Sequence, residues 1–273
     1  MGPLVTFLSD YGYRDEFVGV CRGVIARRCP QARVIDITHG IARHDIRFGA
    51  LALRSALSYM PSGVHLAVVD PGVGARGEHA RRAVALRVAQ EERLLVGPDN
   101  GLLAPAAETF GGVVEAVDIG RSPERLEPVS SSFHGRDIFA PVAGALASGV
   151  PLAQVGEPLP LEDLRGLELP HARVEQRQLC THVLYCDHFG NLILDATHEQ
   201  LAQIGLRLGE QLVITCGPGA YTARYARTFA DVAAGELLLY EDAQQMAALA
   251  VNRGSAAETL GVGRDAELIV SSR

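Results

Sequence analysis

Residues 67–74 read AVVDPGVG, so that an apolar run ends in Asp70 and a Pro-Gly-Val-Gly turn follows directly. A short apolar run bounded by turn residues is typical of a buried strand in a parallel sheet. Asp70 therefore lies at the carboxyl end of a predicted strand. In doubly wound sheets, ligands bind outside the carboxyl ends of the strands. This stretch predicts both a fold class and the sheet edge where the chemistry occurs.

The segments around this strand alternate between strand-like and helix-like patterns. Apolar runs predict four further strands, at residues 3–9, 32–38, 82–89 and 93–99. Helical spacing predicts three helices, within residues 14–30, 46–61 and 136–149. We therefore expect an α/β N-terminal domain over residues 1–165, with a mostly parallel sheet and helices on both faces.

The second part of the chain has a different sequence pattern. Residues 156–171 are rich in Pro, Leu and acidic residues without a steady period, and we interpret them as a linker. Residues 172–273 form short strand-like segments separated by glycine-containing turns. This pattern predicts a small C-terminal antiparallel β-barrel domain.

Composition restricts the classes of function. The 273 residues are 48% hydrophobic, which is enough for a substantial core, and the net charge is −7. An acidic chain is a poor partner for nucleic acid or an anionic membrane, so we expect neither. The N-terminus lacks a basic region typical of signal peptides, so a cytoplasmic protein is expected. The sequence contains no lysine, which excludes Schiff-base and P-loop lysines.

Metal and thiol chemistry are open alternatives. His39, His44, Asp70 and His134 are residue types that ligate zinc or iron, but the HExxH pattern is absent. The five cysteines are scattered without a CxxC pair, which predicts reduced and mostly buried thiols. We expect no metal site, and a catalytic thiol is the weaker reading.

Polar residues follow three of the predicted strands. Asp10 ends the first strand, Asp70 ends the third, and GPDNG (97–101) ends the fifth. His134 precedes a predicted helix in SSSFHGRDIFAP (130–141), where it can donate, accept or titrate. The alternative is that the acids only cap the next element and that the histidine lies on the surface.

The C-terminal part carries a second polar group, in CDHFGNLILD (186–195). Asp187, Phe189 and Asn191 alternate with a period of two, so we expect them on one face of a strand. An acid, an aromatic ring and an amide on one face would clamp a nucleoside or an amino acid. A polar outer face is the alternative, which does not explain the phenylalanine.

Together, these stretches resemble the S-adenosyl-L-methionine (SAM) hydrolases, also called SAM hydroxide adenosyltransferases, which are related to the SAM-dependent fluorinase and chlorinase. The matching segments are TFLSDYGYRDEFVGVCRGVI, VIDITHGIARHDIRFGA, VVDPGVG, VGPDNGLL, SSFHGRDIFAPVA, DHFGNLILD, TFADVAAGELLLY and AVNRGSAAETLG. The resemblance implies an α/β domain followed by a β-barrel, in a homotrimer. It places SAM between the first domain of one subunit and the second domain of its neighbour.

The resemblance also implies catalytic residues, an Asp–Arg–His set that handles water. Asp70 and His134 match this set. For the arginine, counting back from the following strand gives Arg81, and counting forward from Asp70 gives Arg76. We prefer Arg81, because a strand start is better anchored than a loop.

The residues that contact SAM are implied in the same way. Asp10 matches an acid on the ribose hydroxyls, and Asp187 matches an acid near the methionine ammonium group. Asn191 matches an amide at the adenine edge, to which the backbone near Arg253 is also close. Phe189 and Phe229 match aromatic walls. Relatives commonly show Ser and Gly where this chain has Asp242, Ala243, Gln244, Gln245 and Met246, so the contact to the methionine carboxylate is not predicted.

We therefore expect an enzyme that hydrolyses SAM to adenosine and L-methionine, by in-line attack of water at ribose C5′ and without a cofactor. The alternatives are a SAM-dependent halogenase, a metal-dependent nucleoside or nucleotide hydrolase, and a SAM-binding sensor without turnover. An ionised Asp70 at the nucleophile position disfavours a halide, because like charges repel.

Overall fold

The chain divides into two units, one ending at Leu167 and the other beginning at Glu168, in a computed structural model that describes residues 2–77 and 80–272. Part of the predicted linker belongs to the first unit. Glu157–Pro158 form a short strand, β7, and Leu161–Asp163 form a 3₁₀ turn. Irregular chain follows, up to Arg173.

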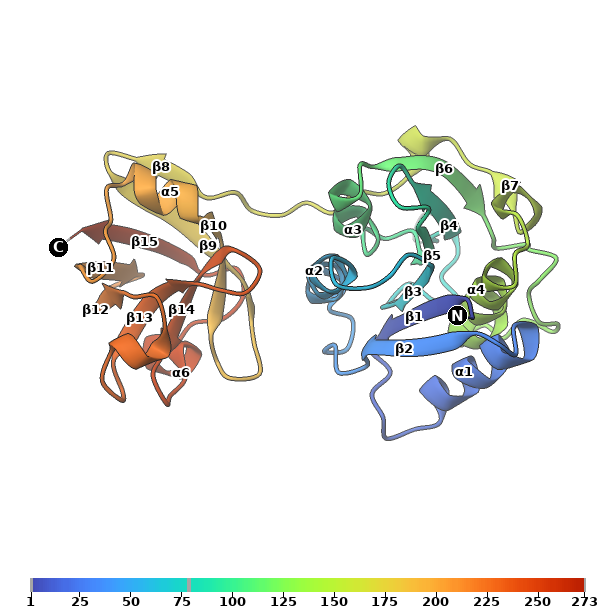
Figure 1. The fold of residues 1–273 in the computed structure, drawn as a ribbon, viewed down its shortest axis with the longest axis horizontal. Coiled ribbons are helices and arrows are strands. Elements are labelled where there is room, and N and C mark those ends of the chain that lie inside the picture. Colours follow the sequence, from blue (N-terminus) through green and yellow to red (C-terminus); the bar gives the residue numbers. More distant parts are fainter. Residues whose placement is uncertain (1, 78–79, 273) are drawn as a thin grey trace. The chain divides into compact units, whose positions relative to one another are not determined.

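The first unit contains a seven-stranded sheet with the order β2-β1-β3-β5-β4-β6-β7 (Figure 1). Besides β7, its strands are β1 (Leu4–Ser9), β2 (Arg33–Thr38), β3 (Val64–Val68), β4 (Ala83–Val88), β5 (Leu94–Pro98) and β6 (Val113–Asp118). Strands β2, β1, β3 and β5 are parallel, whereas β4 pairs antiparallel with both β5 and β6. The predicted mostly parallel sheet is therefore confirmed, with β4 and β7 running in the opposite direction.

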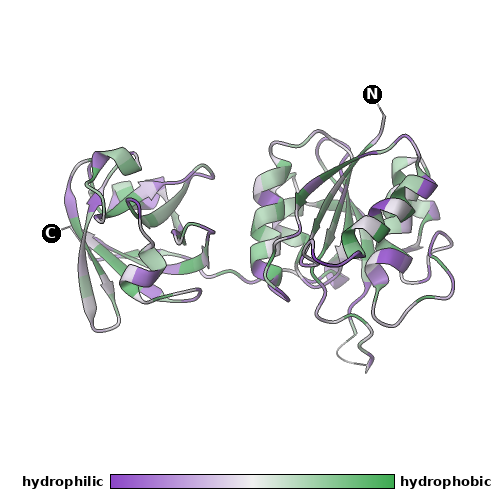
Figure 2. Ribbon diagram, turned by 90° about the horizontal axis from the view of Figure 1, so that it is seen from below, coloured by the Kyte–Doolittle hydropathy of each residue, from purple (hydrophilic) through white to green (hydrophobic). Residues whose placement is uncertain are grey.

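Helices cover both faces of this sheet, as predicted. Helices α1 (Phe17–Arg28) and α4 (Ala140–Ala147) enclose the core that contains Phe7. Helices α2 (Ile46–Leu57) and α3 (Ala104–Thr109) enclose the core that contains Leu8. Successive strand residues point to opposite faces, so a strand buried on both faces is apolar throughout. Figure 2 shows this hydrophobic interior.

The direction of β4 decides which residues reach the edge of the sheet where the parallel strands end. A short connection joins β4 to β5, and Ala83 at the start of β4 pairs with Pro98 at the end of β5. The pairing extends one step further, because the Asp99 N–H donates to the Arg82 carbonyl at 3.0 Å. Residues just before β4 therefore lie beside the carboxyl ends of the parallel strands.

The second unit is a closed β-barrel. Its strands are β8 (Arg173–Glu175), β9 (Gln178–Cys186), β10 (Leu192–Thr197), β11 (Gln211–Cys216), β12 (Gly219–Tyr225), β13 (Leu237–Glu241), β14 (Met246–Val251) and β15 (Glu267–Ser272). The long strand β9 pairs with β15 along one side and with β8 and then β10 along the other, which closes the barrel. All pairings are antiparallel except β12 with β13. The predicted barrel is confirmed.

Two short helices, α5 (His198–Gln203) and α6 (Ala256–Leu260), pack against the barrel core. Among the described residues, no helix combines the length and the apolar character needed to cross a membrane.

Candidate active site

The carboxyl ends of the neighbouring strands β1, β3 and β5 meet at one edge of the first unit. Asp10 follows β1, Asp70 follows β3 after Val69, and Asp99 and Asn100 follow β5. Asn100 ties two of these ends together, because its side-chain amide donates to the Val69 carbonyl at 2.9 Å. The polar turns predicted to gather at one edge are therefore together.

Asp70 is held by Arg81. The Arg81 Nε–H donates to Asp70 Oδ1 at 2.9 Å, and its Nη2 donates to Asp70 Oδ2. This two-point geometry orients a carboxylate in a way that a point charge does not. Both side chains are only 6% exposed. Arg76, the alternative arginine, lies exposed in the turn after Asp70. Of the two candidate arginines, Arg81 is therefore the one that contacts Asp70.

His134 completes this cluster, which we call the Asp70–Arg81–His134 trio. Arg81 Nη2 lies 2.9 Å from His134 Nδ1. A guanidinium only donates, so Nδ1 is the acceptor and the neutral ring carries its proton on Nε2. Burial and the adjacent Arg81 cation lower the pKa of His134, against the opposing charge of Asp70. The ring is therefore neutral near neutral pH.

The turn after Asp70 is fitted against the loop that leads to His134. Gly74 has a φ of +74°, and a Cβ at this position would lie 2.3 Å from the Ser131 carbonyl oxygen. Only glycine permits this close approach and this backbone conformation together. The Pro-Gly-Val-Gly turn therefore brings the Asp70 and His134 segments together.

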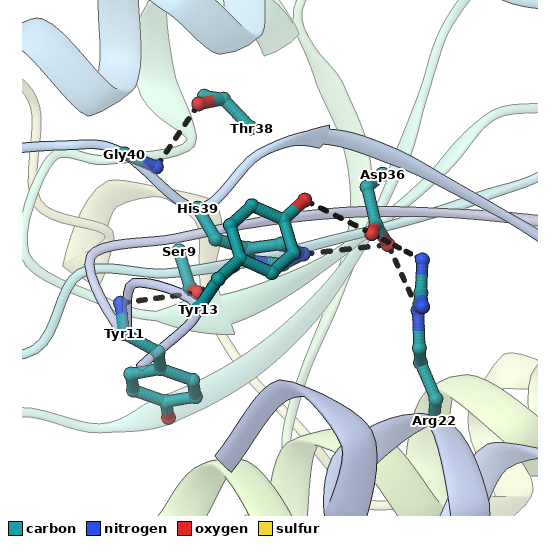
Figure 3. A network of polar contacts seen from close by, with 8 residues as sticks. All are labelled: Ser9, Tyr11, Tyr13, Arg22, Asp36, Thr38, His39 and Gly40. Atoms are coloured by element: carbon teal, nitrogen blue, oxygen red, sulfur yellow. Dashed lines mark hydrogen bonds and ion pairs between the residues drawn. The ribbon is translucent and has the colours of Figure 1, made fainter. Parts of the chain in front are cut away.

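Asp10 lies at the same edge with a partly exposed carboxylate, and its Oδ2 accepts the His44 backbone N–H at 3.0 Å. The loop after Asp10 is fixed by a network around His39 (Figure 3). The buried His39 ring contacts Ser9 Oγ at 2.7 Å through Nδ1 and Asp36 Oδ1 at 3.3 Å through Nε2. Ser9 Oγ also accepts the Tyr11 N–H, so this network positions the residues on both sides of Asp10.

Asp36 has two further partners in this network. Arg22 from α1 binds its carboxylate through two nitrogens, and the Tyr13 hydroxyl donates at 3.2 Å. Sequence reasoning considered His39 only as a metal ligand and did not single out Asp36. An acid inside the otherwise apolar strand pattern of VIDITHG was the available signal.

A polar pocket of about 640 Å³ borders the trio. Arg81 and His134 contribute to its wall, together with Arg82, Asp99 and Arg121. Burial raises the pKa of Asp99, whose side chain is 4% exposed. The pocket gives a small polar molecule such as water access to Arg81 and His134.

In the second unit, the expectation that Asp187, Phe189 and Asn191 share one face of a strand is wrong. They lie in the turn between β9 and β10. Asp187 Oδ1 accepts the backbone N–H groups of Phe189 and Asn191, and Oδ2 accepts the Asn191 side-chain amide at 2.8 Å. A carboxylate that binds amides two and four residues later bends the chain, which a period-two pattern cannot reveal. The acid and amide are nevertheless adjacent, and Phe189 is 76% exposed.

The other residues predicted for the second unit lie near this turn. Arg253 lies exposed in the turn after β14 with a φ of +60°, and this turn leads to Ala257, whose N–H donates to the Gly190 carbonyl. Phe229, 38% exposed, packs against Tyr240 with ring centroids 5.1 Å apart. Burial raises the pKa of Tyr240 to about 12, with the nearby Asp187 charge adding to the effect. Sequence reasoning missed Tyr240.

The stretch 242–246 forms a closed turn of its own. Asp242 Oδ1 accepts the backbone N–H groups of Gln244 and Met246, each at 2.9 Å. Across residues 2–77 and 80–272, no group of three or more His, Cys, Asp or Glu side chains is arranged to hold a metal ion.

Comparison with known proteins gives one family. Residues 5–156 match the N-terminal domain of the SAM hydroxide adenosyltransferases, and residues 181–269 match their C-terminal domain. The (R)-S-adenosyl-L-methionine hydrolase of Salinispora tropica is 46% identical over 262 residues, which cover 95% of this chain and 94% of that protein. A fluorinase of Nocardia brasiliensis is 28% identical over 286 residues, covering 93% and 92%.

The fold has a solved counterpart. The crystal structure of an uncharacterized conserved protein from Thermotoga maritima superposes with a TM-score of 0.89 at 34% identity, and the match covers 98% of this chain and 99% of that one.

Proposed function

The chain belongs to the SAM hydroxide adenosyltransferase family, and from this premise we propose that it hydrolyses SAM to adenosine and L-methionine. The observation that carries the proposal is the buried Asp70–Arg81–His134 trio at the carboxyl edge of the sheet. The relatives' name specifies the (R) form of SAM, and we propose this form as the substrate here.

The reaction is an in-line displacement at ribose C5′. A water oxygen forms a bond to C5′ while the C5′–S bond breaks, and its electron pair converts the sulfonium into the neutral thioether of methionine. The sulfonium is already an activated leaving group, so no acid is needed on that side. The enzyme must orient the water and take up its proton, and such orientation supplies roughly 7–11 kcal/mol when well arranged.

The trio provides these two functions. Asp70 orients the water and accepts its proton as the bond to carbon forms. Arg81 fixes the Asp70 carboxylate by its two-point contact. The His134 Nε2–H donates to oxygen and stabilises the charge that develops on it. General-base assistance of this kind typically contributes about 10²–10⁴ in rate.

The binding roles are part of the same proposal. Asp10 holds the ribose hydroxyls, and Asp187 binds the methionine ammonium group. Asn191 and the Arg253 backbone contact adenine, with Phe189 and Phe229 as aromatic walls. The trio is in the first unit, and the exposed Phe189 and Phe229 are in the second. A homotrimer in which a neighbouring subunit completes each site is part of the same proposal. A cytoplasmic location, where SAM is made and used, fits this substrate.

The direct test is to incubate the purified protein with the (R) and (S) sulfonium forms of SAM separately, and to identify the products by mass. We expect adenosine and methionine, faster from the (R) form. A chloride-containing reaction that yields mainly 5′-chloro-5′-deoxyadenosine would identify a halogenase instead. Retention of SAM without any product would identify a sensor.

Two further measurements address the cofactor and the assembly. The proposed reaction uses only SAM and water, so activity should survive dialysis against a chelator; loss that added metal restores would favour the metal-dependent hydrolase. Light scattering coupled to size exclusion should give three times the subunit mass, and a monomer with full activity would contradict the shared site.

A further inference from the structure

The proposed mechanism leaves unused a partly buried tyrosine of the first unit, next to Asp10. Tyr11 follows Asp10 in the loop after β1, and its ring packs edge-on against three phenylalanines. The centroid distances are 6.4 Å to Phe7, 5.9 Å to Phe17 and 5.8 Å to Phe133. A ring enclosed in this way has little freedom, so the position of its hydroxyl is fixed by packing.

The hydroxyl lies against Gly135. A Cβ built on Gly135 would lie 2.1 Å from Tyr11 Oη and 3.0 Å from Tyr11 Cζ. The φ of Gly135 is not in the left-handed region, so backbone conformation does not require glycine here. The close approach of the tyrosine does require it, since real Cβ atoms do not approach other atoms this closely. The sequence therefore keeps residue 135 without a side chain, and Tyr11 occupies the space.

Gly135 is directly coupled to the trio by the chain. It begins the π-helical turn Gly135–Phe139, and the residue before it is His134. His134 Nδ1 lies 2.9 Å from Arg81 Nη2, so a small displacement of this turn would break the contact. The Tyr11 side chain therefore links the loop that carries Asp10 to the turn that carries His134.

We propose that Tyr11 is a positioning residue, whose hydroxyl, wedged against Gly135, sets the position of His134 on Arg81 and its spacing from Asp10. This inference rests on the proposed function, in which His134 donates to the reacting oxygen. A displacement of about 1 Å in a catalytic group is enough to lower turnover about 100-fold.

The charge state of the hydroxyl is suited to this role. Burial raises the pKa of Tyr11 well above its ordinary value of 10, and the nearby charges of Asp10 and Asp70 act in the same direction. The phenol is therefore neutral over the working pH range and does not compete with Asp70 for the Arg81 cation.

The chain offers a matched control two residues away. Tyr13 belongs to the same loop, but its hydroxyl donates to Asp36 and its side chain is largely exposed. Figure 3 shows the two rings pointing in different directions, Tyr13 toward Asp36 and Tyr11 away from that carboxylate. Tyr11→Phe and Tyr13→Phe therefore remove the same atom from the same loop in two different environments.

The first experiment measures kcat and KM for SAM hydrolysis in both variants. Tyr11→Phe should lower kcat about tenfold with KM within about twofold of wild type, because the substrate contacts are intact and His134 is less well placed. Tyr13→Phe should lower kcat less than Tyr11→Phe does, because Arg22 and His39 still hold Asp36. Equal kcat in Tyr11→Phe and wild type would overturn the proposal, and so would an equal loss in the two variants.

The second experiment tests the contact itself with a double-mutant cycle. Gly135→Ala should lower kcat about 100-fold, because the new Cβ and the hydroxyl cannot occupy the same space. Adding Tyr11→Phe removes the atom 2.1 Å away and should restore at least about tenfold of that loss. A fully active Gly135→Ala variant would contradict the proposal, as would a double variant no better than Gly135→Ala.

A third readout separates failure of this inference from failure of the proposed function. The His134 ring signal, assigned by its loss in His134→Gln, can be titrated by NMR without any substrate. Because the Arg81 cation contributes to the lowered pKa of His134, that pKa should rise in Gly135→Ala and fall back in the double variant. An unchanged His134 pKa across the cycle overturns the positioning role even if no SAM is hydrolysed.

Discussion

Strand β3 has an arginine–histidine contact at each of its two ends, and the two contacts do different things. Near the start of the strand, Arg93 Nη1 lies 3.1 Å from His65 Nε2, and near its carboxyl end Arg81 lies 2.9 Å from His134. Both arginines also contact an aromatic ring, Phe110 for Arg93 and Phe139 for Arg81. Both contacts pair an arginine with a histidine, but the two arginines have different further partners.

Arg93 is bound largely by main-chain groups. Its guanidinium donates to the main-chain carbonyls of Met60 and Pro61 and to the Glu91 carboxylate. His65 is fully buried and also contacts Thr6, and burial with the Arg93 charge lowers its pKa to about 3. Arg81, in contrast, pairs with the side chain of Asp70 beside a polar pocket. The Arg93 contact is therefore structural, because backbone carbonyls hold its guanidinium, whereas the Arg81 contact borders a pocket where chemistry can occur.

The largest effect is expected at the carboxyl end. Asp70→Asn keeps the shape of the side chain but removes the charge that accepts the water proton. We expect kcat for SAM hydrolysis to fall about 10²–10⁴-fold, with SAM affinity measured by calorimetry nearly unchanged. The matched change at the other end, Glu91→Gln, should leave kcat within about twofold. A kcat for Asp70→Asn within tenfold of wild type would remove Asp70 from proton transfer.

The next effect is expected at the start of the strand and concerns stability. Arg93→Met removes the donor to the Met60 and Pro61 carbonyls and to His65. Buried acceptors left without a donor cost about 1–3 kcal/mol each, so the free energy of unfolding should fall by about 2–4 kcal/mol. Urea unfolding followed by circular dichroism measures this change, and kcat per folded molecule should stay within about twofold. A large loss of kcat without a loss of stability would contradict the purely structural role given to Arg93.

The effect that is smallest near neutral pH is expected in the acid dependence of stability. His65 has a pKa of about 3 in the folded chain, below the value of about 6.5 for an unfolded histidine. The unfolded state therefore binds the proton first, and the stability is fully present above about pH 6.5 and is lost as the pH falls toward about 3. The loss approaches roughly 1.4 kcal/mol per pH unit for this group.

The matched variants are His65→Gln, which keeps an acceptor for Arg93, and His171→Gln at an exposed position. His65→Gln should flatten the acid slope of the free energy of unfolding, measured by urea unfolding at several pH values. His171→Gln should follow the wild-type slope. If the slope in His65→Gln is unchanged, a group other than His65 causes the loss of stability at low pH.

Sequence patterns predicted most of the fold because the strands of the first unit are buried on both faces. Their continuous apolar runs, such as 64–69, are unambiguous. Strand β6 and helix α3 were not predicted, since Val113–Asp118 is partly exposed and α3 has only six residues. The turn at Asp187 was mistaken for strand, because a carboxylate that caps its own turn leaves an alternating pattern in the sequence.

The site was predicted only in part for a related reason. Asp10 and Asp70 come at the ends of buried strands, so the local sequence pattern is enough to predict where they lie. Tyr11 and Gly135 are 124 positions apart in the sequence, and neither segment indicates that one fills the space left by the other. The Ser9–His39 contact and the proximity of Tyr240 to Asp187 were missed for the same reason.

Burial and turn chemistry act over a few neighbouring residues, so the sequence alone predicts the two-domain division, the buried parallel strands and the acids at their carboxyl ends. The contact between Arg81 and Asp70 depends on the tertiary structure, because β4 runs antiparallel beside β5 and brings its first residues to the edge where the parallel strands end. The tertiary structure also decided which of two similar arginine–histidine contacts faces a pocket, since that depends on which end of a strand the fold leaves open.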